Sequence, residues 1–321
     1  MPESDARVTG LHHVTAIAGS AQENLDFYTG TLGMRLVKKS VNQDDPGTYH
    51  LFYADAVGHP GTDLTFFPWQ GVAALGRKGV GLTVEVALVV PPGTLDFWSE
   101  RLSGSARTPG AAVERFGERS LPFQDPHGLE LALVESADPR EFMPWDGSPV
   151  PADRQIRGIH AVRLWERERA ATGDFLTGVL GFEEAGEEAG WHRYALGEGR
   201  RSGSLLELKE LPDVRRGAWG TGSVHHVAWR VPDDASQVAL RERLAEAGRH
   251  PTEVIDRFWF RSVYFREPGG VLFEVATDGP GFSVDEDPGA LGERLVLPPW
   301  LEPRRERIEE VLPPLYAEAR A

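Results

Sequence analysis

Apolar and polar positions along this chain follow one pattern four times. Runs of alternating or continuous apolar residues predict a strand, a period close to 3.6 residues then predicts an amphipathic helix, and shorter apolar runs broken by Gly and Pro predict further strands. The closing strand of each copy is rich in Val, Leu and Phe, at positions 64–67, 129–134, 205–209 and 271–276. The pattern predicts a strand–helix–three-strand (βαβββ) module of about 60 residues, repeated four times.

Sequence repetition supports the same module independently. The segment 26–34 (DFYTGTLGM) matches 174–182 (DFLTGVLGF) without a gap, 148 positions later. The same offset places 10–14 (GLHHV) over 158–162 (GIHAV). One ungapped register across two separate segments indicates that the modules are duplicates of each other.

The repeats and a Pro-rich, polar stretch divide the chain into two halves and a tail. The expected boundaries are 1–137 for an N-terminal half (modules 8–70 and 79–137), 138–156 for a linker, 157–280 for a C-terminal half (modules 157–211 and 221–280), and 281–321 for an extended tail with one short helix. The predicted fold class is α+β, with four βαβββ modules that form two cupped sheets.

A pair of histidines occurs twice in the same local setting. The phrase LHHVT at 11–15 returns as VHHVA at 224–228. The third repeat has Ala161 at the second histidine position, so His13 and His226 form the matched pair. Two distant strands that present imidazole in one register suggest modules that meet around one metal ion. Modules one and four are therefore expected to share a sheet.

Strand geometry assigns the two histidines of each phrase to opposite faces, because successive side chains of a strand alternate. His13 should share its face with Leu11, while His12 points the other way. By the same rule, His225 should point away from the site that His226 faces. Five isolated histidines are expected mostly in solvated loops or strand ends, at positions 50, 59, 127, 192 and 250.

The best candidate for a third ligand is a carboxylate within a closing strand. Glu274 interrupts an otherwise apolar run, and burial of an uncompensated carboxylate would cost several kcal/mol. Glu207 occupies the matching position of repeat three, but its own repeat has Ala161. Repeat two offers Thr83 and Ala132 at the corresponding places. We therefore expect Glu207 to be exposed or paired with arginine.

Two histidines and one carboxylate form the facial triad of non-haem Fe(II) oxygenases, and Mn(II) suits the same ligands. The triad leaves three adjacent coordination positions open, enough for a phenolate oxygen and O₂ to bind side by side. The predicted ligands are His13, His226 and Glu274. If the modules paired in sequence order instead, His160 would take the place of His13.

Composition excludes several classes of protein. The chain has no cysteine, so thiolate metal sites, disulfides and thiol nucleophiles are excluded. The net charge of −15 opposes binding to nucleic acid or anionic membranes. The first five residues lack a basic and an apolar region, so a cytoplasmic enzyme is expected. A homo-oligomer is compatible with the sequence. The acidic cluster at 285–287 is expected to be a surface turn rather than a calcium site.

Residues 8–280 resemble the vicinal oxygen chelate superfamily, in which paired βαβββ modules form a cupped sheet around a metal. Within it, the chain resembles ring-cleaving dioxygenases that act on hydroquinones and related phenols. The shared phrases are GLHHVT at 10–15, YHL at 49–51, FFP at 66–68, HH at 225–226 and PGGVLFE at 268–274, with a similar tail from 285 through 291 to 299. Sequential pairing would instead match the pattern of the better-known catechol extradiol enzymes.

The resemblance also implies residues around the metal. Tyr264 resembles the family's active-site tyrosine, which would hydrogen-bond the substrate, and Arg257 would offset developing negative charge. The family pattern has extra residues here, so the match to Arg257 is open by one or two positions. His12, His225 and Thr15 resemble residues that orient ligands or shuttle protons.

The sequence therefore predicts an Fe(II)-dependent dioxygenase that inserts O₂ into a small hydroquinone-like or catechol-like aromatic. The resemblance implies a ring-opened semialdehyde or acyl product that contains both oxygen atoms. One alternative is a glyoxalase-type lyase or isomerase with Zn²⁺ or Ni²⁺, which would need a fourth protein ligand where repeat one has Thr65. The other is a non-catalytic protein that sequesters a small molecule, which would leave a buried Glu274 unexplained.

Overall fold

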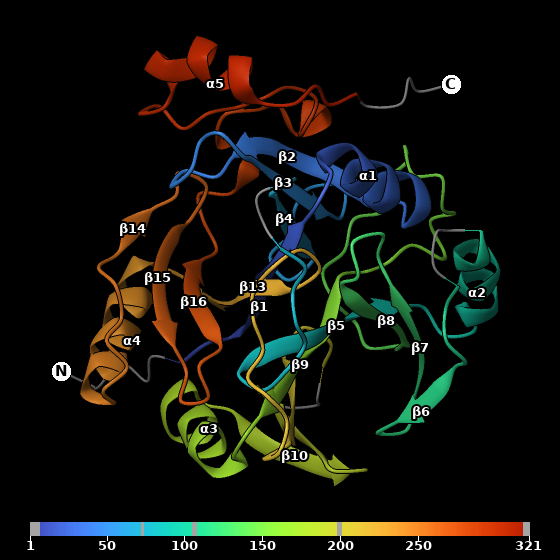
Figure 1. Ribbon diagram of the computed structural model, residues 1–321, viewed down its shortest axis with the longest axis vertical. Helices are drawn as coiled ribbons and strands as arrows, with labels where there is room; N and C mark the ends of the chain where they lie inside the picture. Colours follow the sequence, from blue (N-terminus) through green and yellow to red (C-terminus); the bar gives the residue numbers. More distant parts are fainter. Residues whose placement is uncertain (1–6, 72–73, 105–107, 198–200, 317–321) are drawn as a thin grey trace.

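Four strand–helix–three-strand modules build two eight-stranded sheets in the computed structural model (Figure 1). The structure describes residues 7–71, 74–104, 108–197 and 201–316. The expected tail therefore continues for five residues beyond the described part, and the N-terminal segment considered for a targeting signal lies outside it. None of the described helices is long and apolar enough to cross a membrane.

Each module begins with a long buried strand and a helix, and three shorter strands follow. Module one is β1 Gly10–Ala18, α1 Ala21–Leu25 with a π-helical continuation Asp26–Thr31, β2 Arg35–Val41, β3 Tyr49–Ala54 and β4 Asp63–Pro68. Module two is β5 Leu82–Val90, α2 Leu95–Ser103, β6 Val113–Arg115, β7 Glu118–Gln124 and β8 Glu130–Glu135. Module three is β9 Ile159–Glu166, α3 Arg169–Phe175 with a π-helical continuation Leu176–Leu180, β10 Glu183–Glu188, β11 Trp191–Ala195 and β12 Leu205–Glu210. Module four is β13 Val224–Val231, α4 Asp234–Glu246, β14 Ile255–Asp256, β15 Arg261–Arg266 and β16 Leu272–Thr277.

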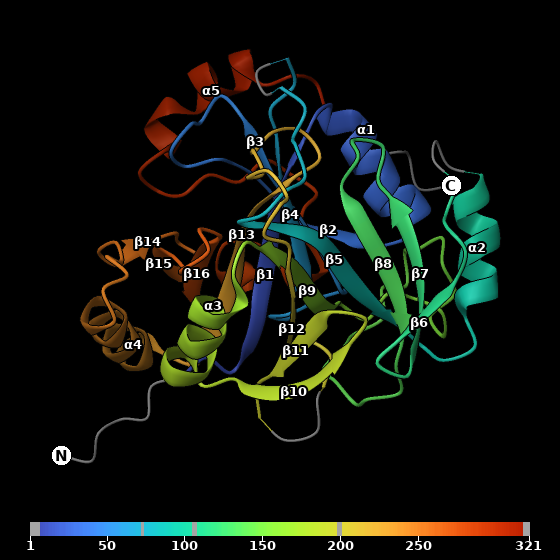
Figure 2. The same ribbon diagram turned by 60° about the horizontal axis from the view of Figure 1, so that its bottom comes forward.

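The modules pair one with four and two with three. One sheet has the strand order β14-β15-β16-β13-β1-β4-β3-β2, and the other has the order β10-β11-β12-β9-β5-β8-β7-β6. The antiparallel pairs β1–β13 and β5–β9 lie at the centres of the two sheets (Figure 2). The predicted fold class and the pairing of modules one and four are confirmed, and the sequential alternative is wrong. Each sequence half thus contributes one module to each sheet.

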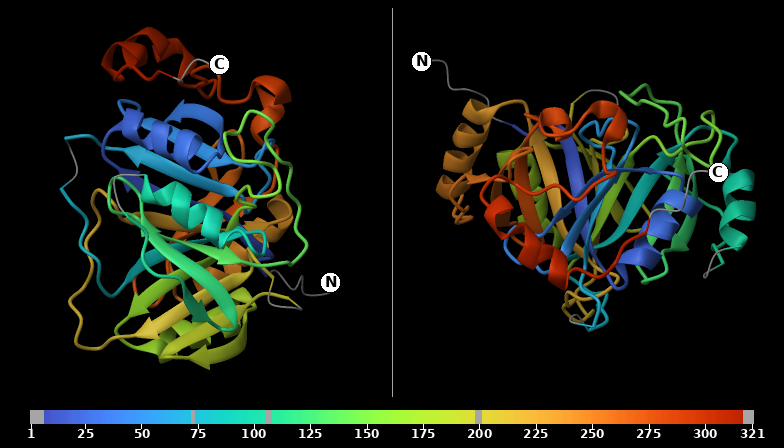
Figure 3. Two further views of the ribbon diagram at one scale, coloured as in Figure 1. Left: turned by 90° about the vertical axis from the view of Figure 1, so that its right-hand side faces the viewer. Right: turned by 90° about the horizontal axis from the view of Figure 1, so that it is seen from above.

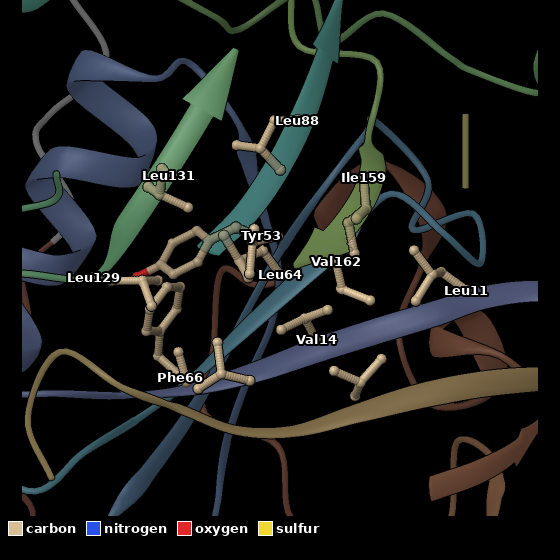
Figure 4. Close-up of a cluster of buried hydrophobic side chains, with 14 of the residues drawn as sticks. Leu11, Val14, Tyr53, Leu64, Phe66, Leu88, Leu129, Leu131, Ile159 and Val162 are labelled. Atoms are coloured by element: carbon tan, nitrogen blue, oxygen red, sulfur yellow. The ribbon is translucent and has the colours of Figure 1, made fainter. Parts of the chain in front are cut away.

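Apolar side chains from both sheets meet in one core (Figure 4). Val14, Leu64 and Phe66 come from the first sheet, and Leu88 and Val162 come from the second. All five are fully buried. One face of each sheet therefore packs in the shared core, and the opposite face curves around a hollow. The hollow of the sheet that contains β1 is the first cup, and that of the sheet that contains β5 is the second cup.

Two irregularities in the β1–β13 ladder decide which side chains face the first cup. Leu11 pairs with Trp229 but His13 pairs with Ala228, so His12 is an extra residue on β1. A second shift follows: Thr15 pairs with His226 but Ala16 pairs with Val224, so His225 is an extra residue on β13. A β-bulge of this kind interrupts the alternation of side chains. The prediction that Leu11 and His13 share a face is therefore wrong, and Leu11 belongs to the core.

The C-terminal segment packs across the edge strand β2 of the first sheet (Figure 3). It contains three short 3₁₀ turns, Phe282–Val284, Pro288–Ala290 and Glu302–Arg304, and the helix α5 Arg305–Val311. Phe282, Leu291 and Val296 from this segment complete an apolar cluster with Phe52 and Trp259 inside the cup. The tail therefore closes one end of the cup.

Candidate metal centre

Three buried side chains from three strands meet inside the first cup. His13 lies on β1, His226 on β13 and Glu274 on β16. Ala228 pairs with His13 on one side and with Glu274 on the other, which brings both side chains close to His226, two residues earlier on the same strand. Their ligand atoms lie within 4.8 Å of one another, and they form the only such metal-ligating cluster among the described residues.

The spacing of these atoms fits a cation with three adjacent ligands. Nε2 of His226 is 2.9 Å from Oε2 of Glu274, and Nε2 of His13 is 3.4 Å from the same oxygen. The two Nε2 atoms are 3.2 Å apart. Ligand atoms about 2.1 Å from one ion and at right angles to each other are about 3 Å apart. Oε2 of Glu274 is buried without a hydrogen-bond partner, as expected of an oxygen that coordinates a cation.

The protonation states also suit a cation. Burial would raise the pKa of Glu274, but His13 and His226 hold that pKa well below its usual value. Burial lowers the pKa of His226 despite its contact with Glu274. The hydroxyl of Ser262 donates to Oε1 of Glu274 at 2.5 Å, which leaves Oε2 directed at the imidazoles. A carboxylate beside neutral imidazole is the state in which a divalent cation binds.

His12 fixes the tautomer of His13. Nε2 of His12 is 3.1 Å from the carbonyl oxygen of Thr277, and Nδ1 of His12 is 2.9 Å from Nδ1 of His13. A carbonyl oxygen can only accept, so the His12 proton lies on Nε2 and its Nδ1 accepts from the Nδ1–H of His13. Burial and the neighbouring His13 lower the pKa of His12 to about 3. The Nε2 lone pair of His13 is therefore free for a cation.

His225 makes the same contact on the other strand but faces the pocket. Its Nδ1 is 2.8 Å from Nδ1 of His226, and its ring stacks on Trp219 with the centroids 4.6 Å apart. The expectation that alternation turns His12 and His225 away from the centre is wrong. The bulges at these two residues bring both rings against the histidines that follow them.

Tyr264 and Arg257 lie on the module-four side of the site. The Tyr264 ring packs edge-on against His226, with the centroids 5.6 Å apart. Burial and then the nearby Glu274 carboxylate raise the pKa of Tyr264, so its hydroxyl keeps its proton. The guanidinium of Arg257 lies 5.5 Å from the Tyr264 ring and forms a bidentate ion pair with Asp44 at 2.9 and 3.1 Å.

Thr15 lies two residues after His13 on β1, opposite His226 on β13, and its hydroxyl bonds to other polar side chains. Its hydroxyl is 2.7 Å from that of Thr65, which is 2.8 Å from Nε2 of His50. His50 is half-buried, lines the pocket and packs its ring against Phe52 and Phe67, so it is not among the solvated histidines. The side chain of His127 is also largely buried, whereas His250 is exposed. The phrase YHL at 49–51 was the signal that could have identified His50 as a site residue.

A pocket of about 420 Å³ opens directly onto the centre. Polar residues of the β2–β3 loop, Asn42 to Asp45, lie along one part of it. The rest is largely aromatic and apolar, lined by Phe52, Phe67, Trp69, Trp259, Phe260, Tyr264 and Leu272 with the histidines and Arg257. The mainly aromatic and apolar lining suits a flat aromatic ring, and the volume leaves space around a single benzene unit.

The family model described as "Glyoxalase/Bleomycin resistance protein/Dioxygenase superfamily" matches residues 10–84 and 158–275. The chain belongs to this superfamily. The membership predicted from the repeats is therefore confirmed. Glyoxalase I from Zea mays, a crystal structure at 17% identity, has a TM-score of 0.62 over 84% of this chain and 92% of its own, which shows the shared fold.

Three relatives within the superfamily match almost the whole chain. The "Putative ring-cleaving dioxygenase MhqO" of Bacillus subtilis is 44% identical over 96% of this chain and 97% of its own length. The "Chlorohydroquinone/hydroquinone 1,2-dioxygenase" of Sphingobium indicum is 36% identical over 94% of this chain and 95% of its own. The crystal structure of a "putative dioxygenase" from Bacillus subtilis has a TM-score of 0.90 at 42% identity, over 97% of this chain and 98% of its own.

Among the residues that the structure describes, the second cup of this protein holds a network of ion pairs instead of a cluster of metal ligands. Glu85 and Glu207 occupy the positions that His13 and Glu274 have in the first sheet, and Arg163, which pairs with both, occupies the position of Ala228. The Arg163 guanidinium donates to both carboxylates. Arg193 and Arg115 also donate to Glu207. A guanidinium thus occupies the middle of the second cup.

Glu207 and His160 are therefore not part of the first centre. Glu207 is paired with arginines, one of the two outcomes expected for it, and despite its burial these arginines lower its pKa to about 2. His160 lies in the second cup, with Nε2 3.4 Å from Glu118. The assignment of Thr83 to the first ligand position is wrong, because a bulge between Thr83 and Glu85 places Glu85 there.

Proposed function

We propose that this protein is an Fe(II)-dependent ring-cleaving dioxygenase that inserts O₂ into a hydroquinone-like or catechol-like aromatic. The observation that carries the proposal is the cluster of His13, His226 and Glu274 at the floor of an aromatic-lined pocket. Two relatives support the same reaction class: one at 44% identity is named a putative ring-cleaving dioxygenase, and one at 36% identity is named a chlorohydroquinone/hydroquinone 1,2-dioxygenase. Mn(II) suits the same ligands and is the alternative metal.

In this proposal, His13, His226 and Glu274 would hold the metal at the pocket. Bound Fe(II) would supply the redox chemistry that joins O₂ to the ring. His12 holds the His13 ring in the tautomer that binds metal. Ser262 orients the Glu274 carboxylate. The product would be a ring-opened semialdehyde or acyl compound that contains both oxygen atoms of O₂.

The remaining pocket residues bind and polarise the aromatic ring. Tyr264 keeps its proton and can donate to a phenolate oxygen of the substrate. Arg257 stabilises negative charge on the ring oxygens, and its ion pair with Asp44 holds it at the pocket mouth. The proton of His225 lies on Nε2 when its Nδ1 accepts from His226, so His225 can deliver a proton to the pocket. Aromatic side chains exclude water around the ring.

A glyoxalase-type lyase lacks support in this geometry. It would need a fourth protein ligand, and Thr65, the candidate position, bonds to Thr15 and His50 instead. A sequestering protein would leave three buried, mutually directed ligand atoms without a role.

The test is anaerobic purification, loading with Fe(II), metal analysis, and O₂ uptake with hydroquinone and with catechol. We expect one iron per chain and O₂ uptake by the wild type, loss of both in His13→Ala, and retention of both in His160→Ala, the matched control from the second cup. Retained activity in His13→Ala would refute the ligand set. Bound zinc or nickel with no O₂ uptake under any metal loading would refute the dioxygenase.

A further inference from the structure

The loop between β14 and β15 carries much of the pocket wall. Arg257, Trp259 and Phe260 all line the pocket, within four consecutive residues. Phe258, between them, has a left-handed backbone with φ of 74°, a conformation that is unusual for a bulky residue and costs free energy. Surrounding contacts must hold such a conformation in place. The Phe260 ring lies 5.1 and 5.2 Å from the rings of His12 and His13, so this loop reaches the metal candidates.

The C-terminal tail makes those contacts. The backbone N–H of Gly281 donates to the carbonyl of Trp259 at 2.8 Å. The indole N–H of Trp259 lies 3.2 Å from both carboxylate oxygens of Asp285. Further along the tail, the Trp300 ring packs edge-on against Phe258, with the centroids 6.2 Å apart. Three separate points of the tail therefore hold one four-residue loop.

A buried lysine anchors the tail at the same place. Lys38 on β2 is fully buried, and its ammonium donates to Asp285, to Glu286 and to the carbonyl of Phe282. The same ammonium lies 5.3 Å from the centre of the Trp259 ring. Two carboxylates and one carbonyl offset the charge of a lysine that could not otherwise be buried. The acidic cluster at 285–287, expected as a surface turn, thus ties the tail to the edge strand β2 through Asp285 and Glu286.

We propose that the C-terminal tail determines the size of ring that the pocket accepts, because Asp285, anchored by Lys38, positions Trp259 as the pocket wall. Asp285 is a positioning residue, since it touches the pocket only through the Trp259 indole. This inference rests on the proposed function, in that the pocket is taken to bind an aromatic ring. With Trp259 held in place, the wall favours an unsubstituted ring over one with a bulky substituent.

The test compares the binding of two rings without turnover. The full-length protein is loaded with Zn(II), which the same nitrogen and oxygen ligands bind, and titrated under anaerobic conditions by calorimetry with hydroquinone and with tert-butylhydroquinone. The readout is the ratio of the two dissociation constants, which is independent of the fraction of protein that is folded. In Asp285→Ala we expect the preference for the small ring to fall roughly three- to tenfold, the effect of losing one buried hydrogen bond. Bound Zn(II) should stay at the wild-type level.

Asp287→Ala is the matched control, because Asp287 lies in the same acidic cluster, is exposed and bonds to the backbone of Gly289. It should keep the wild-type ratio. Trp300→Ala is the second test variant, because Trp300 is partly exposed and lies outside the pocket lining, and it should lower the preference about twofold.

A wild-type ratio in Asp285→Ala, or an equal change in Asp287→Ala, would overturn the inference. If Asp285→Ala does not fold, an unchanged ratio in Trp300→Ala would overturn it. Failure of both rings to bind the wild type would overturn it as well. Absence of O₂ uptake by the Fe(II)-loaded protein, with ring binding and the shifted ratio retained, would refute only the proposed function.

Discussion

Replacement of His12 tests how the centre is preorganised. In His12→Ala, the Nδ1–H of His13 loses the acceptor that lies 2.9 Å away in a fully buried setting. A buried donor left without a partner costs about 1 to 3 kcal/mol. Loss of such an outer hydrogen bond weakens metal binding by about 10- to 100-fold, or about 1.4 to 2.7 kcal/mol. The expected loss of metal affinity lies within the cost of the unpaired donor.

The assay is a competition titration of Zn(II) against a chromophoric chelator, with dissociation constants for the wild type and variants. His12→Gln, whose side-chain carbonyl can accept from His13, should recover part of the affinity. His192→Ala, a half-buried histidine in the second sheet, should bind as the wild type does. A dissociation constant for His12→Ala within twofold of the wild type would refute the role of His12 in setting the tautomer.

Three further predictions concern stability. Burial and mutual repulsion raise the pKa of Glu166, to about 9, and burial raises that of Glu267, so the folded protein holds a proton here that the unfolded chain releases above about pH 4.5. The stability that this pair contributes is present at low pH and declines between about pH 5 and 9. In urea titrations, Glu166→Gln should raise the free energy of unfolding by about 2 kcal/mol at pH 8 and flatten its pH profile. Replacement of the exposed Glu242 by Gln should do neither. Arg163→Met leaves buried carboxylates in the second cup without their central cation and should lower the free energy of unfolding by about 3 kcal/mol at unchanged metal content; a parallel loss of metal would contradict the separation of the two cups. Removal of metal by a chelator should lower the Tm measured by calorimetry. If the free metal had been at 100 times its Kd, the loss corresponds to about 2.7 kcal/mol of stability. A His13→Ala protein whose Tm still responds to metal would contradict the assignment of His13 as a ligand.

The repeats predicted most of the fold, because the ungapped match between modules one and three aligns their first strands and helices. That register, with Ala161 at the second histidine position, was enough to pair module one with module four. It also identified Glu274, since an isolated carboxylate in an apolar strand needs a partner. These inferences need only the local sequence and a comparison between the repeated modules, and both can be read from one chain.

The errors came from bulges and from long-range burial. One extra residue at His12 moved Leu11 into the core and turned His12 toward the centre, and the same kind of shift placed Glu85 rather than Thr83 in the second cup. Sequence alternation does not reveal such an insertion. The burial of Lys38 depends on carboxylates more than 240 positions away, which no local pattern indicates.

The guanidinium of Arg163 gives the second cup a cation that is part of the chain itself. That half of the molecule therefore needs nothing from solution to neutralise its buried carboxylates, and it can complete its structure as the polypeptide folds. Because the two sheets share one core, the finished second cup supports the backbone of the first before any ion arrives. We therefore expect the chain to fold first and to bind metal afterwards, so that a shortage of metal lowers the metal-loaded fraction but not the yield of folded protein.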